Sequence, residues 1–309
     1  MDPLSGINPK KDSTLAMMLA ADKAGWEVHS IEMGDMWLRD GVSYATSNIV
    51  KVFDDTHHWF DIKDTQTIAL ADIDCLLMRK DPPFNMEYIY CTYLLQLASD
   101  AGALVVNNPQ ALRDANEKLF TAWFSQCCAP TLVSRQQSQI RDFLNEHEDI
   151  ILKPLDGMGG ESIFRVNKRD ANFAVITETL TAHGNRYAMA QRFIPEISSG
   201  DKRILLINGE PVPYALARIP TGNEHRGNLA AGGRGEGVIL TERDYWICQQ
   251  LAPTLRAKGL LFVGIDVIGD YLTEINITSP TCIRELDSLY DLDIAGQLIQ
   301  CIEAQLQEN

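Results

Sequence analysis

The sequence is poor in basic residues. Its 27 lysines and arginines stand against 42 aspartates and glutamates in 309 residues, which gives a formal net charge of −15. This balance argues against a protein that binds nucleic acid or an anionic membrane surface. It does not exclude ATP as a ligand, because a local cationic pocket together with Mg²⁺ can outweigh a negative average charge.

The chain also lacks a transmembrane run and a cysteine framework. The apolar run Leu15–Ala21 is short, and its flanking residues, Asp12 or Ser13 before it and Gly25 after it, indicate an amphipathic helix rather than a signal peptide. Seven cysteines occur, without a C-x-x-C pair or zinc spacing. An odd number of cysteines in a long chain favours a reducing compartment, so we expect a cytoplasmic protein. From the acidic net charge we expect no nucleic-acid or membrane partner.

Helix and strand patterns alternate along the first third of the chain. The predicted elements are a helix over 13–24, a strand over 26–33, a strand over 73–78, a helix over 85–101 and a strand over 103–107. This order predicts a small, mostly parallel sheet. Residues 40–70 alternate only weakly and are expected to form short strands and loops.

The rest of the chain indicates a second α/β unit, and the length allows two or three subdomains. A helix is expected over 113–124, and Asn208-Gly209 is a strong hairpin turn signal. The other expected elements are strands over 149–153, 161–166, 187–193, 203–207 and 211–219, and helices over 170–182, 241–258 and from about 291.

Residues 263–276 read as two short strands around a Gly269-Asp270-Tyr271 turn. An odd, three-residue turn would place Asp266 opposite Glu274, and Asn276 would share the face of Glu274. Two carboxylates and an amide oxygen suit Mg²⁺, which leaves room for phosphate oxygens and water. The alternative is a polar outer face on an amphipathic hairpin.

Two glycine-rich loops precede this hairpin. The first follows Lys153, is not a Walker A loop or a dinucleotide fingerprint, and could aim backbone N–H groups at phosphate, or be a plain hairpin with a surface lysine. The second spans about 220–237 and carries Arg226 and Arg234. A loop of this length and composition fits a lid over phosphates, or a disordered loop.

Three features follow one another: a phosphate loop after Lys153, an arginine loop at about 220–237 and a carboxylate hairpin at 263–276. This order resembles the ATP-grasp superfamily, and the sequences of five segments look like bacterial glutathione synthetase. Those segments are Met78–Phe84, Asn116–Phe124, Ile151–Gly160, Arg226–Arg234 and Thr273–Glu285. The resemblance covers nearly the whole chain. It implies an α/β protein, with an N-terminal Rossmann-like (pre-ATP-grasp) domain over 1–115 followed by an ATP-grasp fold over 116–309 with its lid loop at about 220–237.

The resemblance also implies a reaction. ATP would drive the ligation of γ-glutamylcysteine to glycine through an acyl phosphate, giving glutathione, ADP and phosphate without an enzyme nucleophile. Two Mg²⁺ ions are expected as cofactors, with Mn²⁺ as a substitute, because carboxylates facing a triphosphate would otherwise repel it. A homotetramer is expected from the resemblance alone.

Site residues are carried over onto matching positions of this sequence. Lys118 and Lys153 match lysines on the nucleotide phosphates, and Asp266, Glu274 and Asn276 match the metal ligands. The phosphate loop is matched by Gly157, Gly159 and Gly160, and the adenine-binding backbone segment by residues from Gln191 through Phe193 to Ile194. The candidate binders of substrate carboxylates or phosphate are Arg203, Arg218 and Arg284, with Arg226 on the lid.

The chain departs from the family at its start. Bacterial glutathione synthetases begin with an apolar strand that leads into a Met-Asp-Pro segment, whereas this sequence opens on Met1-Asp2-Pro3. We expect a natural start about ten residues upstream, unless another segment fills the gap or the subunit tolerates it. Two other functions stay open: another ATP-grasp carboxylate–amine ligase, or a non-catalytic ATP-binding regulator such as synapsin.

Overall fold

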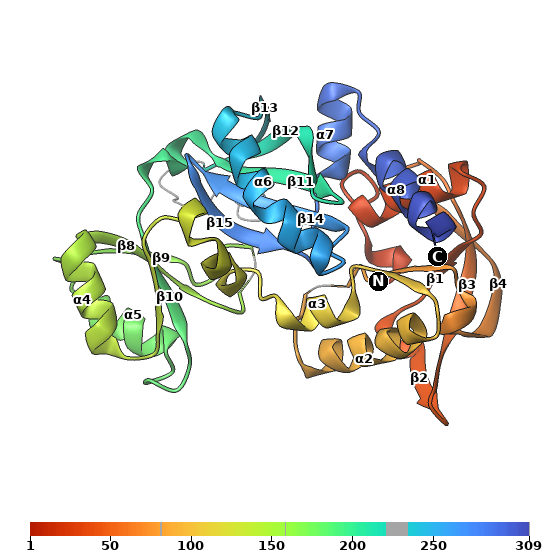
Figure 1. Ribbon diagram of the computed structural model, residues 1–309, viewed down its shortest axis with the longest axis horizontal. Coiled ribbons are helices and arrows are strands. Elements are labelled where there is room, and N and C mark those ends of the chain that lie inside the picture. Colours follow the sequence, from red (N-terminus) through yellow and green to blue (C-terminus); the bar gives the residue numbers. More distant parts are fainter. Residues whose placement is uncertain (81, 158, 221–233, 309) are drawn as a thin grey trace.

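A computed structural model describes residues 1–80, 82–157, 159–220 and 234–308. Three groups of elements follow one another across the molecule (Figure 1). The N-terminal elements lie on one side, a five-stranded sheet with its helices fills the middle, and a small lobe built around α4 and α5 projects on the other side. None of the helices in the described part of the chain is long and apolar enough to cross a membrane.

The N-terminal part contains two sheets. A four-stranded antiparallel sheet joins β1 (Val28–Ser30), β2 (Met36–Arg39), β3 (Val42–Val52) and β4 (Phe60–Ala69). A second sheet pairs β5 (Cys75–Leu77) with β6 (Leu104–Val106) in parallel. The helices are α1 (Ser13–Lys23), α2 (Met86–Asp100) and α3 (Pro109–Asp114).

Two expectations for this part are corrected. The predicted sheet was mostly parallel, but among the described residues only β5 and β6 pair in that direction, because the predicted strand at 26–33 pairs antiparallel with β3. The weakly alternating residues 40–70 form two long strands of 11 and 10 residues rather than short strands and loops. Their pairing is a local hairpin, which weak periodicity along each strand does not reveal.

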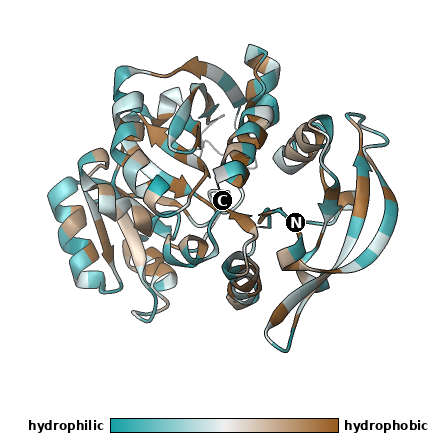
Figure 2. Cartoon of the chain, turned by 45° about the vertical axis from the view of Figure 1, so that its right-hand side comes forward, coloured by the Kyte–Doolittle hydropathy of each residue, from teal (hydrophilic) through white to brown (hydrophobic). Residues whose placement is uncertain are grey.

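The small lobe has its own sheet and core. Its strands β7 (Thr131–Ser134), β8 (Asp149–Pro154), β9 (Phe164–Asn167) and β10 (Ala188–Arg192) lie in the order β7-β10-β8-β9. Helices α4 (Gln137–His147) and α5 (Phe173–Leu180) pack on it through Leu144 and Phe173. In Figure 2 the helices at the molecular surface carry both hydrophilic and hydrophobic residues, as amphipathic helices do.

The central sheet has the order β13-β12-β11-β14-β15 and is antiparallel throughout. Its strands are β11 (Asp201–Ile207), β12 (Glu210–Ile219), β13 (Arg234–Ile239), β14 (Phe262–Ile268) and β15 (Tyr271–Asn276). The remaining helices are α6 (Glu242–Ala257), α7 (Ile283–Tyr290) and α8 (Ile294–Glu308), so the single C-terminal helix expected from about 291 is preceded by a further helix.

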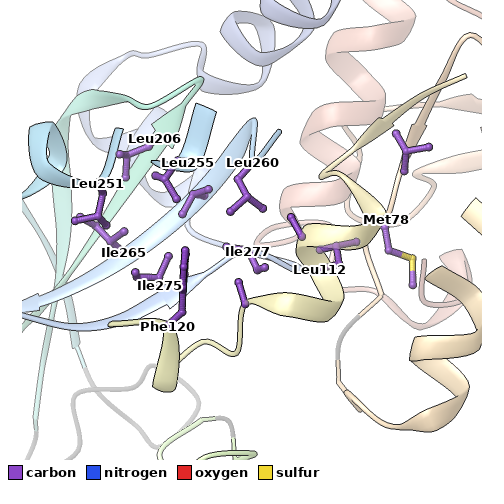
Figure 3. Close-up of a cluster of buried hydrophobic side chains, with 14 of the residues drawn as sticks. Met78, Leu112, Phe120, Leu206, Leu251, Leu255, Leu260, Ile265, Ile275 and Ile277 are labelled. Atoms are coloured by element: carbon purple, nitrogen blue, oxygen red, sulfur yellow. The ribbon is translucent and has the colours of Figure 1, made fainter. Parts of the chain in front are cut away.

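Alternate residues of the central strands enter two different cores. Leu206 and Ile265 pack with Leu251 and Leu255 of α6 (Figure 3), and Ile204 belongs to the same core. Leu205 and Leu216 point to the opposite face and pack with α1, α7 and α8. The C-terminal helix α8 therefore lies against α1 of the N-terminal part, and the two ends of the chain share one core.

The helix expected over 113–124 is interrupted. Helix α3 ends at Asp114, and the next turn, a kinked 3₁₀ segment, begins only at Leu119. The side chain of Asn116 accepts hydrogen bonds from the backbone N–H groups of Lys118 and Leu119, which stabilises a turn instead of a continuous helix. This break sets the direction in which the side chain of Lys118 points.

A groove of about 150 Å³ lies beside β1 and β5 and is lined by Met17, Val28 and Leu76, among others. Within the described residues, β1 pairs only with β3 and β5 only with β6. The second edges of β1 and β5 thus have no strand partner among these residues. The groove therefore offers apolar surface and strand edges that an added extended segment could contact.

We therefore predict that an apolar, strand-forming segment of about ten residues added upstream of Met1 will stabilise the protein. It would pair the free strand edges and bury the side chains that line the groove. The melting temperature should rise by at least about 5 °C, measured by calorimetry. A Gly/Ser extension of equal length is the control, and equal melting of both extended forms would contradict the proposal.

Candidate active site

The carboxylate hairpin has the predicted register, but a shorter turn and a bulge produce it in place of the expected three-residue turn. Asp266 on β14 is paired with Glu274 on β15, and Gly264 with Asn276. The turn itself contains only Gly269 and Asp270, because Ile268 pairs with Tyr271. A bulge restores the register, since Thr273 has no partner between the pairs formed by its neighbours. Asp266, Glu274 and Asn276 consequently share one face.

Asp266 is the centre of a buried charge network. Arg203 donates from Nε to Oδ1 of Asp266 and from Nη2 to Oδ2, the latter at 2.9 Å, and Nη2 of Arg218 lies 2.9 Å from the same Oδ2. Asp266 is 1% exposed. Burial alone would raise the pKa of Asp266, but the two guanidinium groups outweigh that effect and hold the pKa well below its usual range.

Asp201, which the sequence analysis did not select, belongs to the same network. It is paired with Arg218 across β11 and β12 and accepts a hydrogen bond from that side chain. Burial raises the pKa of Asp201 to about 7, with Arg218 acting in the opposite direction. Its position two residues before Arg203 on one strand face is the signal that could have identified it.

Two buried lysines approach the hairpin from different elements. Lys118, in the segment after α3, forms ion pairs with Glu117 and, at 3.7 Å, with Glu274. Lys153, near the end of β8 in the small lobe, lies 3.5 Å from the carbonyl oxygen of Thr273. Burial lowers the pKa of Lys153, whereas Glu274 and Glu117 overcome burial and raise that of Lys118. Both positions were predicted as phosphate-binding lysines.

A cavity of about 300 Å³ is lined by several of these groups, although Asp201, Asp266 and Lys153 are not among its lining residues. The predicted residues that line it are Lys118, Gly157, Gly159, Gly160, Arg203, Arg218, Glu274 and Asn276. Gly159 and Gly160 have φ angles of 63° and 81°, which side-chain-bearing residues rarely adopt. The glycine loop can therefore bring its backbone close to a ligand next to the lysine and carboxylate groups.

The hairpin offers a donor set that fits Mg²⁺. Within the described residues no three His, Cys, Asp or Glu side chains group closely enough to hold a metal, but the amide of Asn276 adds a hard oxygen to two carboxylates. Glu274 and Asn276 line the cavity directly. In the described part of the chain, Oδ1 of Asp266 accepts from Nε of Arg203 alone and keeps a further lone pair for a cation. Oδ2 already receives Arg203, Arg218 and, at 3.4 Å, the Asn276 amide nitrogen.

Other predicted residues lie outside this cavity. Gln191 is buried on β10 and donates to Thr131, and Ile194 is also buried; neither they nor Phe193 line it. Arg284 pairs with Asp54 and is likewise not among the lining residues. Arg226 and most of the predicted lid lie outside the described residues. The roles of all these residues stay predictions.

Comparisons with known proteins agree along the whole chain. Residues 1–113 match the model of the prokaryotic glutathione synthetase N-terminal domain, and residues 117–291 match that of the prokaryotic glutathione synthetase ATP-grasp domain. A glutathione synthetase of Vibrio vulnificus (strain CMCP6) is 58% identical over 307 residues, 99% of this chain and 97% of the relative. One of Escherichia coli (strain K12) is 57% identical over 308 residues, 100% of this chain and 98% of the relative.

Solved structures with low sequence identity share the fold. The ATP-grasp ligase PsnB, complexed with precursor peptide PsnA2 and AMPPNP, has a TM-score of 0.63 at 17% identity and covers 99% of this chain and 96% of its own. The D-cycloserine synthetase DcsG has a TM-score of 0.61 at 16% identity, covering 77% of this chain and 86% of its own. These likenesses establish the fold.

The network around Asp266 makes a prediction about stability. Asp266→Asn would leave Arg203 and Arg218 buried with one carboxylate, Asp201, in place of two, and breaking such a pair typically costs about 3–5 kcal/mol. We expect that loss in the free energy of unfolding, measured with urea. Glu274→Gln is the matched control on the same hairpin, because Lys118 would keep Glu117 as its partner. An equal, small effect of both substitutions would contradict this account.

Proposed function

This chain belongs to the prokaryotic glutathione synthetase family, and on that premise we propose which of its residues carry out the reaction. It is an ATP-dependent ligase of glutathione biosynthesis with an ATP-grasp fold. The observation that carries the proposal is the single cavity shared by Lys118, the glycine loop, Glu274 and the two buried arginines.

The proposed substrates are ATP, γ-glutamylcysteine and glycine. The cysteinyl carboxylate attacks the γ-phosphorus of ATP, and ADP leaves. The amine of glycine then attacks the acyl phosphate carbon, phosphate leaves, and the amine loses a proton to give the amide. Every group in this sequence comes from a substrate, so the protein contributes positioning and charge stabilisation.

Within that scheme Lys118 and Lys153 bind nucleotide phosphates, together with backbone N–H groups of the glycine loop. The supporting observation is their convergence on the β14–β15 hairpin from separate elements. Arg203 and Arg218 line the cavity, and each guanidinium has donors beyond those that Asp266 and Asp201 use. We assign them to a substrate carboxylate or the transferring phosphoryl group.

Asp266, Glu274 and Asn276 would hold Mg²⁺, with two ions proposed and Mn²⁺ as a substitute. Bound there, the metal would neutralise phosphate charge and polarise the γ-phosphoryl group. Without a cation, Glu274 would face the triphosphate as a like charge. The adenine assignment to residues 191–194 and the roles of Arg284 and Arg226 rest on the family resemblance, as does assembly into a homotetramer. All seven cysteines are free thiols, which agrees with a cytoplasmic location.

The substrate assignment makes a prediction about products. With ATP, Mg²⁺ and γ-glutamylcysteine, addition of glycine should increase ADP release strongly and yield equal amounts of glutathione, measured by coupled assay and mass spectrometry. Glycine is the attacking amine in the second step, so little stable product should form without it. Equal ADP release with D-alanine in place of glycine would instead favour another ATP-grasp ligase.

The metal assignment makes a second prediction. Glu274→Gln keeps the side-chain shape but removes one ligand charge, and we expect turnover to fall at least about 100-fold, as when one electrostatic stabiliser is lost. Glu210→Gln is the control, because that carboxylate lies on the same sheet but pairs with the exposed Arg256. Near-normal turnover of the Glu274 variant at saturating Mg²⁺ would refute the assignment.

A further inference from the structure

The cavity continues from the phosphate loop into the N-terminal part of the chain. There it is lined by Asp2, Asp12, Ser13, Thr14 and Arg79, none of which the proposed chemistry uses. The first four precede or begin α1, and Arg79 follows the carboxyl end of β5 by two residues. Ligands of α/β sheets bind beyond the carboxyl ends of parallel strands. This end of the cavity thus has the position of a substrate subsite.

Asp12 differs from the other carboxylates that line the cavity. Asp2 is paired with Lys80, and Glu117 and Glu274 are paired with Lys118. Asp12 caps α1 by accepting the backbone N–H of Leu15 at one oxygen, and no cationic side chain of the described residues lies within ion-pair distance of it. Its charge is available to a cationic ligand.

Arg79 offers the opposite charge. It is 6% exposed, and it donates from Nε to Thr14 and from Nη2 to the carbonyl oxygen of Pro280. Both partners are neutral, and no carboxylate in the described part of the chain forms an ion pair with it. Burial lowers the pKa of Arg79 to about 10, and the charge of Asp12 acts in the opposite direction, so the two side chains lie near each other without forming an ion pair. The two contacts of Arg79 hold its guanidinium in place and leave Nη1 for a ligand.

From these two side chains we infer a subsite for an α-amino acid head group, in which Asp12 binds the ammonium and Arg79 the carboxylate. The inference rests on the proposed function, which supplies a ligand with this chemistry. In γ-glutamylcysteine the γ-linkage leaves the α-amino and α-carboxylate groups of the glutamyl residue free. They lie at the opposite end of the molecule from the carboxylate that is phosphorylated.

Glycine also carries an ammonium and a carboxylate, but it fits this subsite less well. An amine held as a cation by Asp12 has no lone pair with which to attack the acyl phosphate. The glutamyl head group takes no part in bond formation, so a charged clamp on it can hold the dipeptide while its other end reacts. Asp12 and Arg79 act here as binding and specificity residues.

Asp12→Asn tests the ammonium half of the subsite, because Asn caps helices as well as Asp and the substitution removes only the charge. We expect KM for γ-glutamylcysteine to rise about 10- to 100-fold, the value of a charge-assisted hydrogen bond. KM for ATP and for glycine should stay unchanged. Asp2→Asn is the matched control, since Asp2 lines the same cavity but is already paired with Lys80. Asp12→Ser, another capping residue, serves if the first variant folds poorly.

Substrate analogues separate recognition of the head group from a general effect on the site. Glutarylcysteine lacks the α-amino group, so the wild type should have a high KM for it. Asp12→Asn should not raise that KM further. Likewise 4-aminobutanoyl-cysteine lacks the α-carboxylate. Arg79→Lys should therefore raise KM for this analogue less than KM for the natural dipeptide.

Three results would overturn the inference. The first is an equal loss with glutarylcysteine and the natural dipeptide in Asp12→Asn. The second is a rise in KM for glycine alone, which would place glycine in the subsite. The third is an unchanged KM in a folded variant. Absence of any ligation by the wild type would instead remove the proposed function, and this inference with it.

Discussion

The bidentate contact between Arg203 and Asp266 is the interaction on which the site depends. It connects β11 with β14 in the middle of the central sheet, and Arg218 joins β12 to the same carboxylate. Such a network is costly to bury unless every charge is paired and hydrogen-bonded. Because Arg203, Arg218 and Asp266 come from three different strands, their pairing requires the correct register of all three. The same register also positions Glu274 and Asn276.

The opposite pKa directions of Asp266 and Asp201 follow from their places in this network. Asp266 receives two guanidinium groups, whereas Asp201 has one and faces the charges of Asp266 and Glu274. The cluster therefore has more negative charge than its arginines fully compensate. Lys118 offsets part of it, and a divalent cation would offset the rest. The local charge of this site, and not the net charge of −15 of the whole chain, therefore decides whether it can accept a polyanion.

Short-range signals were read correctly from the sequence, and long-range pairing was not. The spacing of Glu274 and Asn276 predicted that they share a face, because side chains alternate along a strand. The position of Asp266 opposite Glu274 was also predicted, but it depends on a shorter turn together with a bulge. The turn was misjudged, since the bulge at Thr273 has no signature in composition. The direction of the strand at 26–33 was wrong for a related reason: its partner, β3, is selected by packing and not by a local pattern.

The same limit explains why the sequence did not reveal Asp12 and Arg79. In the sequence Asp12 was interpreted as a residue at the start of a helix, which is correct. One of its carboxylate oxygens accepts the backbone N–H of Leu15 and caps α1. Arg79 belonged to a segment valued only for its resemblance to a family. Asp12 and Arg79 line the same cavity for two reasons. Helix α8 packs α1 against the central sheet, and Arg79 donates to the carbonyl oxygen of Pro280, which follows the β14–β15 hairpin. Residues near position 12, 79 and 280 meet only in the folded chain, so the substrate end of the cavity is a property of the domain contact and not of any one motif.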